Sequence, residues 1–139
     1  MTGLLDRVSA YTDGGSRGNP GPSAIGVLVH SESGNPLAQV GEVIGQATNN
    51  QAEYAAVLKA LQVSTRFTKG EVHIHSDSEL LVKQLKGSYK VKNEGIREAF
   101  SRVKEAEKAF RKVIYTHVKR DNPKIKLADM LVNRALDQG

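Results

Sequence analysis

Three short segments near the start of the chain are rich in the apolar residues of β-strands and are bounded by turn signals. They run from Arg7 to Asp13, from Ser23 to His30 and from Pro36 to Ile44. The glycine-rich stretch Gly14–Pro22 separates the first two segments, and the turn sequence Ser33–Pro36 separates the next two. Strands with such short connections predict an antiparallel meander.

The period of the pattern changes at Thr48. Thr48 and Gln51 have the spacing of a helix capping box, and Ala52–Val63 continues with good helix formers. Glu71–Ser76 has the character of a strand again, and Ser78–Leu85 is suited to a short helix. The middle of the chain therefore alternates helix, strand and helix.

The last third of the chain predicts an amphipathic helix, a fifth strand and a final helix. Apolar residues recur at helical spacing between Ile96 and Phe110, the strand runs from Val113 to Val118, and the last helix follows Pro123. The order is βββαβααβα. Because a helix between two strands favours parallel pairing, we expect an α/β fold in one domain, residues 1–139. Its sheet should be mixed and five-stranded, with the first three strands antiparallel and helices on its flanks.

Composition excludes several classes of protein. The 139 residues include no cysteine, which excludes a disulfide framework and a cysteine-ligated zinc. No apolar stretch approaches the roughly 20 residues of a membrane span, and the first residues lack a signal peptide's apolar core. We therefore expect a monomeric cytoplasmic protein without a membrane partner.

The net charge of +5 is unevenly distributed. Five basic residues balance five acidic ones before Gly70, so the excess lies after it, where fifteen Lys and Arg face ten Asp and Glu. Such an excess suits a polyanionic partner. A solvated helix face with many ion pairs is the alternative interpretation.

Four acidic residues fall at positions that can converge. Asp13 is expected to close the first strand and Asp77 the fourth, and these strands should be neighbours. Glu53 and Asp129 should lie near helix N-termini, where the helix dipole favours negative charge. A lone acid is usually a capping or solvated residue, but four clustered carboxylates repel one another and need cations. Hard oxygen ligands in this number suit Mg²⁺ or Mn²⁺.

Four longer motifs carry a family resemblance. They are YTDGGSRGNPGPSAIG (11–26), TNNQAEYAAVLKAL (48–61), HSDSELLVKQLKG (75–87) and HVKRDNPKIKLADMLVNRAL (117–136). In this order and spacing the sequence resembles type 1 ribonuclease H over nearly its whole length, and the family's five-stranded mixed sheet agrees with the predicted order of elements.

The resemblance implies an endonuclease that hydrolyses the RNA strand of RNA–DNA hybrids and leaves 5′-phosphate and 3′-hydroxyl ends. The family's catalytic carboxylates match Asp13, Glu53, Asp77 and Asp129. By resemblance these four residues bind two Mg²⁺ ions, which Mn²⁺ can replace, and Asp13 is shared by both ions. Two cations can activate the attacking water and stabilise the leaving oxygen.

The resemblance also suggests residues that bind the substrate. Amides can recognise the 2′-hydroxyl of RNA in a minor groove, and glycines let the backbone approach closely. Hydroxyl and backbone groups at a helix start can hold a phosphate of the DNA strand. The candidates are Gly15, Ser16, Asn19, Thr48, Asn49 and Asn50. Taken alone, each is also an ordinary cap or turn residue. The partner should be an RNA–DNA hybrid, and other RNA-containing duplexes are further candidates.

The chain departs from many bacterial family members after the fourth strand's helix. Those members carry a basic, tryptophan-rich insertion there, whereas this chain has only GSYKVKNEG (87–95) and no tryptophan. Tyr89, Lys90 and Lys92 can replace it in part, and Lys90 is therefore a further candidate for substrate binding. The chain in this respect resembles the compact, archaeal-like branch of the family.

A second departure precedes Asp129. Ile125 stands where family members often have Asn, and the family's loop histidine is missing. Arg120 is the candidate for the mobile polar residue of this loop, with a plain surface arginine as the alternative interpretation.

Two further interpretations stay open. His73, His75 and Asp77 alternate and could bind a transition metal, although packing within the strand is the better explanation. The protein could also be a catalytically weak or silent ribonuclease H-like protein that binds nucleic acid, because its insertion and loop are altered. A different carboxylate-dependent nuclease fits the asparagines and the glycine turn less well.

Overall fold

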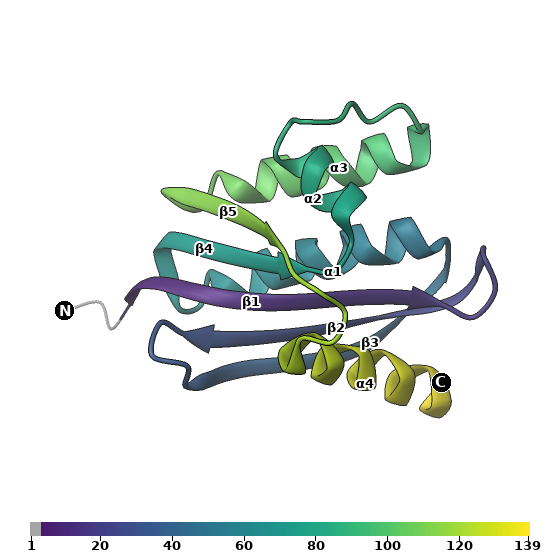
Figure 1. Ribbon diagram of the computed structural model, residues 1–139, viewed down its shortest axis with the longest axis horizontal. Helices are drawn as coiled ribbons and strands as arrows, with labels where there is room; N and C mark the ends of the chain where they lie inside the picture. Colours follow the sequence, from purple (N-terminus) through teal and green to yellow (C-terminus); the bar gives the residue numbers. More distant parts are fainter. Residues whose placement is uncertain (1–3) are drawn as a thin grey trace.

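The computed structural model describes residues 4–139, which contain a mixed five-stranded sheet in the order β3-β2-β1-β4-β5 (Figure 1). Strands β1, β2 and β3 form an antiparallel meander, β4 is parallel to β1, and β5 is parallel to β4. The strands are β1 (Leu5–Ser16), β2 (Gly21–Ser31), β3 (Pro36–Ala47), β4 (Thr68–Ser76) and β5 (Lys112–His117).

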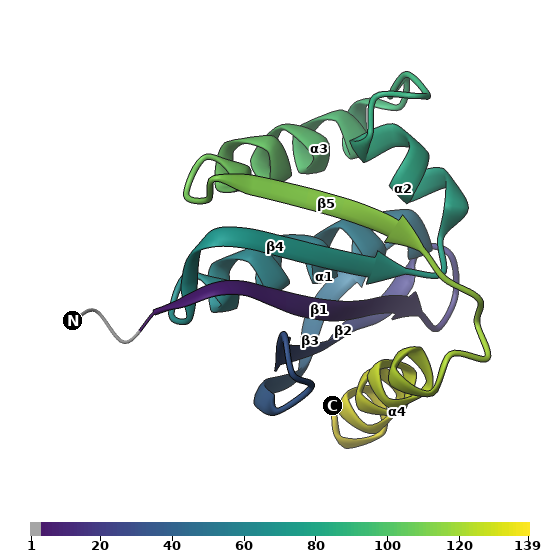
Figure 2. The same ribbon diagram turned by 60° about the vertical axis from the view of Figure 1, so that its left-hand side comes forward.

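Helices cover both faces of the sheet. The helices α1, α2 and α3 lie on one face and α4 lies on the other (Figures 1 and 2). Their bounds are α1 (Asn49–Ser64), α2 (Glu79–Leu85), α3 (Glu94–Glu107) and α4 (Pro123–Gln138). The expected α/β fold, order of elements and mixed sheet are confirmed.

The alternating pattern of the strands determines which side chains enter the core. Along β1, Val8, Ala10 and Thr12 are buried, whereas the residues between them stay partly exposed. The buried side of the sheet packs against α1, whose Tyr54 and Leu61 are almost fully inaccessible. The main core therefore lies between the sheet and α1. Helix α4 contributes fewer buried side chains than α1, namely Ile125, Ala128 and Val132.

Several element boundaries differ from the sequence predictions by a few residues, among them the ends of β1 and α3. Strand β1 continues three residues past Asp13, because its pairing with β2 extends to Ser16 opposite Ser23. Helix α3 ends at Glu107, so Phe110 is not part of it, although it is buried in the turn that follows. Within residues 4–139, no helix combines the length and the hydropathy needed to cross a bilayer.

Candidate active site

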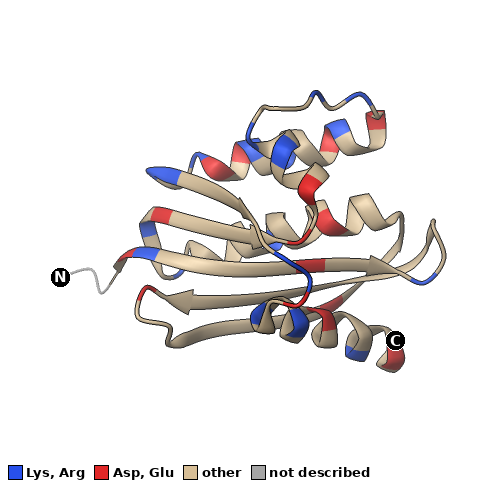
Figure 3. Cartoon of the chain, in the orientation of Figure 1, with Lys and Arg blue, Asp and Glu red and all other residues tan. Residues whose placement is uncertain are grey.

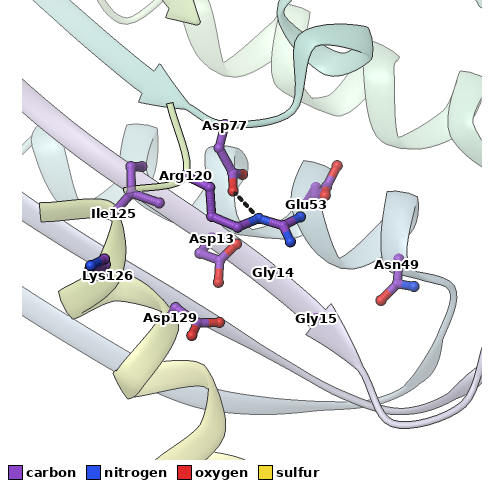
Figure 4. Close-up of a pocket in the computed structure, with 10 residues that line it drawn as sticks. All are labelled: Asp13, Gly14, Gly15, Asn49, Glu53, Asp77, Arg120, Ile125, Lys126 and Asp129. Carbon is purple, nitrogen blue, oxygen red and sulfur yellow. Dashed lines mark ion pairs between the residues drawn. The ribbon is translucent and has the colours of Figure 1, made fainter. Parts of the chain in front are cut away.

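The four acids predicted to converge line one cleft at an end of the sheet. Asp13 lies on β1 beyond the last residue paired with β4, and Asp77 directly follows β4. Glu53 comes from α1 and Asp129 from α4, so the two faces of the sheet contribute one acid each. The cleft has a volume of about 570 Å³, and Asp13 lies between the other acids (Figure 4). Its remaining lining residues are Gly14, Gly15, Asn49, Arg120, Ile125 and Lys126.

A glycine brings α1 against the sheet beside Asp13. A Cβ atom on Gly14 would overlap the backbone carbonyl of Ala52, the residue that precedes Glu53. The missing side chain therefore permits the contact that places Glu53 at the cleft.

A second glycine has the same role for α4. Gly26 pairs with Asp13 across β1 and β2, and a Cβ on Gly26 would overlap the carbonyl of Ala128. Ala128 precedes Asp129, so this contact brings the fourth acid towards Asp13.

Burial and mutual repulsion perturb two of the acids. Burial first, and then the charge of Asp77 and the hydrogen bond and charge of Asp129, raise the pKa of Asp13 to about 8. Burial also raises the pKa of Glu53 to about 7, although a hydrogen bond from Ser78 opposes the shift. Ionising a carboxyl next to other carboxylates is costly, and a bound cation stabilises the ionised form because it offsets the repulsion.

The donor set fits hard divalent cations, since it consists of carboxylates alone. Among the described residues, no three Asp, Glu or His side chains are already placed to hold a single ion. The four acids instead surround an open cleft with Asp13 at its middle (Figure 4).

The glycine-rich turn and the start of α1 are joined at the rim of the cleft. The backbone amide of Ser16 donates to Asn49 Oδ1 at 2.9 Å, and the backbone amide of Asn49 donates to Asn19 Oδ1 at 3.0 Å. Thr48 caps α1 in the predicted capping box with Gln51. The structure thus brings together the turn and helix residues that were predicted to bind RNA.

A second hollow of about 220 Å³ adjoins this rim. Asn19, Thr48 and Asn50 line it together with Asn93, the N-cap of α3. Sequence reasoning missed Asn93, because only the fold brings the start of α3 to the start of α1. Lys90 is exposed and lines neither of these two hollows.

Comparisons with known proteins agree with this arrangement. A family model described as reverse transcriptase-like matches residues 11–135. Ribonuclease HI of Halobacterium salinarum is 42% identical over 131 residues, which cover 94% of this chain and 65% of that protein. A bifunctional protein of Mycobacterium tuberculosis is 35% identical over 132 residues, which cover 94% of this chain and 36% of that protein. The chain thus spans less than two thirds of the length of either relative.

Solved structures show the same fold. The crystal structure of ribonuclease H1 from Halobacterium salinarum has a TM-score of 0.90 and 41% identity, covering 96% of this chain and 99% of that one. The chain belongs to the type 1 ribonuclease H family. A further member, LC11 ribonuclease H1 in complex with an RNA/DNA hybrid, has a TM-score of 0.86 and 39% identity, covering 94% of this chain and 97% of that one.

Two basic side chains of this ribonuclease H-family chain reach the acidic cleft. Arg120 Nε lies 3.5 Å from Asp77 Oδ2, and its side chain is 93% exposed (Figure 4). Lys126 also lines the cleft, and sequence reasoning missed it. Its spacing three residues before Asp129 was the available signal, because residues three apart share a helix face.

The helix-dipole argument for Glu53 and Asp129 was wrong. Neither α1 nor α4 has an acid in its first turn, since Glu53 is the fifth residue of α1 and Asp129 the seventh of α4. The dipole acts mainly within the first turn. The close backbone contacts at Gly14 and Gly26 explain instead why these two acids lie at the cleft.

The histidines of β4 take part in contacts within the sheet. His75 stacks on Tyr11, with ring centroids 4.3 Å apart, and its Nδ1 lies 3.1 Å from the Ala10 carbonyl. His73 Nε2 lies 3.0 Å from a carboxylate oxygen of Glu71. These are the contacts of packing residues.

Proposed function

We propose that this protein is an endoribonuclease that hydrolyses the RNA strand of RNA–DNA hybrids. The observation that carries the proposal is the partly buried carboxyl of Asp13 among three other acids in one open cleft. The names of the relatives support it, and so does the RNA/DNA hybrid in the complex of LC11 ribonuclease H1.

The four carboxylates would hold two Mg²⁺ ions, or two Mn²⁺ ions in their place. Asp13 is central in the cleft and would contact both ions, with Glu53 and Asp77 completing one site and Asp129 the other. When bound, the ions would supply activation of the attacking water and stabilisation of the leaving 3′ oxygen. The products would carry 5′-phosphate and 3′-hydroxyl ends.

The rim of the cleft would recognise the RNA strand. Gly15 and Asn49 line the cleft and Asn19 lines the adjoining hollow, so the side-chain amides of Asn19 and Asn49 can contact 2′-hydroxyl groups. Ser16 would act through its backbone amide, which holds Asn49 in place.

The second hollow would hold a phosphate of the DNA strand. Two helix N-termini, of α1 and α3, meet there, and the partial positive charge of helix starts favours anions. Thr48, Asn50 and Asn93 supply hydroxyl and amide groups.

Basic residues would attract the rest of the duplex. The connection between α2 and α3 carries Lys86, Lys90 and Lys92 and no acid, whereas the two helices carry both basic and acidic residues (Figure 3). Arg120 would contact a phosphate at the cleft and help the product to leave, because it is exposed and held there by a single ion pair.

The test is incubation of the protein with an end-labelled RNA–DNA hybrid in Mg²⁺ or Mn²⁺. Internal cuts in the RNA strand that disappear with Asp13→Asn would support the proposal, and duplex RNA and duplex DNA define the substrate range. Hybrid binding without cleavage in either metal would indicate the catalytically silent alternative.

A further inference from the structure

The turn between β1 and β2 is exposed but held in place from two sides. On one side it is joined to α1 by two hydrogen bonds, in which the backbone amide of Ser16 donates to the Asn49 side chain and the backbone amide of Asn49 donates to the Asn19 side chain. These bonds set the position of the turn relative to the start of α1, but they do not involve α4.

Arg17 holds the turn on the other side. Its Nη2 lies 2.6 Å from Asp137 Oδ1 and donates to the backbone carbonyl of Asn133 at 3.4 Å. The side chain thus reaches from the turn to the last turns of α4, more than a hundred residues further along the chain.

The last turns of α4 are packed less deeply than the rest of the helix. Ala135 and Leu136 are half-buried and Gly139 lies against Val43 of β3, whereas the fully buried side chains all precede Asn133. Among residues 4–139, Arg17 provides the side-chain hydrogen bond and the ion pair that join these last turns to the rest of the molecule.

Asn133 connects this anchor to the cleft. Its Nδ2 donates to the backbone carbonyl of Asp129 at 3.1 Å and lies 3.3 Å from the carboxylate Oδ2. The residue whose carbonyl accepts from Arg17 therefore also orients the carboxylate of Asp129.

We infer that Arg17 is a positioning residue that connects the RNA-side turn to Asp129 through α4. The inference rests on the proposed function, because it assumes that the turn meets RNA and that Asp129 binds a cation. Loss of Arg17 uncouples the turn from α4, although the turn keeps its bonds to α1, so it should moderately weaken substrate binding and cation binding together.

The experiment compares Arg17→Ala with Arg7→Ala. Arg7 lies at the opposite end of β1 and also makes ion pairs, with Glu32 and Glu71, so it is a matched control. Arg17→Ala should raise both the KM for a hybrid and the Mg²⁺ concentration for half-saturation by about three- to five-fold, the size that an exposed ion pair supports. Arg7→Ala should change neither, even if both variants lower the melting temperature equally.

Asp137 provides a second readout. Asp137→Ala should have the same effects as Arg17→Ala, the two should not add in the double variant, and the exchange Arg17→Asp with Asp137→Arg should restore part of the loss. Additive effects, or an Arg17→Ala variant that matches Arg7→Ala, would overturn the inference.

Failure of the inference can be distinguished from failure of the proposed function. Absence of hybrid cleavage by the unmodified protein in either metal would count against the function alone. Calorimetric titration of the same variants with Mg²⁺ needs no cleavage, and it would still show whether Arg17 affects the cation site.

Discussion

Replacing Asp13 by asparagine should stabilise the metal-free protein at neutral pH, although Asp13 is central to the proposed activity. Burial and the neighbouring acids raise the pKa of this carboxyl from its ordinary 3.8 to about 8. Its ionised form is therefore unfavourable in the folded chain and ordinary in the unfolded chain. An amide has nearly the same shape and carries no charge, so it removes this cost.

The size of the effect follows from proton linkage. Below pH 3.8 the carboxyl is protonated in both states and costs nothing. Between pH 3.8 and about 8 the unfolded chain has lost the proton and the folded chain keeps it, so stability falls by up to about 1.4 kcal/mol per pH unit. At pH 7 this limit amounts to roughly 4 kcal/mol, and we expect about 2–4 kcal/mol because neighbouring acids share the repulsion.

The assay is urea denaturation in EDTA, from pH 4 to pH 9. The free energy of unfolding of Asp13→Asn should equal that of the unmodified protein near pH 4 and exceed it increasingly up to about pH 8. The control is Asp6→Asn, which removes an exposed carboxyl from the other end of β1 and should change stability by less than about 0.5 kcal/mol. Adding Mg²⁺ should then stabilise the unmodified protein more than the variant.

One result would refute the reasoning. If Asp13→Asn is equally stable or less stable at pH 7 without metal, the four acids do not repel one another as their burial and proximity imply. A stability difference that is independent of pH would likewise exclude proton linkage as its cause.

Three other predictions follow from single contacts. Gly26→Ala should push α4 from the sheet, costing about 1–3 kcal/mol in thermal unfolding and lowering cleavage at least ten-fold with all four acids present. Thr48→Ala removes the cap of α1 and should cost about 1 kcal/mol in the same measurement, with Thr65→Ala near the other end as control. Arg120→Ala breaks the contact with Asp77 and should lower kcat and KM together in steady-state cleavage, with kcat/KM within about two-fold, since product release is expected to slow.

The fold was predictable because its elements have clear local patterns. The β-type residues from Arg7 identified the first strand, and the capping box at Thr48 located the start of α1 correctly. The end of β1 was placed too early because its glycines resemble a turn, whereas β2 continues to pair with them as far as Ser16. Local propensity cannot detect a partner strand that extends an element.

The parts of the site that the sequence did not indicate depend on tertiary contacts. Asn93 reaches the second hollow only because α3 starts beside α1, and Arg17 reaches α4 although more than a hundred residues separate them along the chain. Each side chain also has an ordinary local explanation, as a helix cap or an exposed arginine. Nothing in the local pattern distinguishes these residues from others of their kind.

The convergence of the acids depends on two absent side chains. Gly14 follows Asp13 along β1, and Gly26 lies opposite Asp13 on β2, so the two glycines adjoin the central acid on opposite faces of the sheet. Each glycine lets the backbone of a helix approach the sheet, and the contact falls on the residue that precedes Glu53 on α1 or Asp129 on α4. Burial and the charge of Asp77 are the main causes of the raised pKa of Asp13, and the close backbone packing at the two glycines adds the contributions of Asp129 and Glu53. A bound cation would convert that cost into affinity.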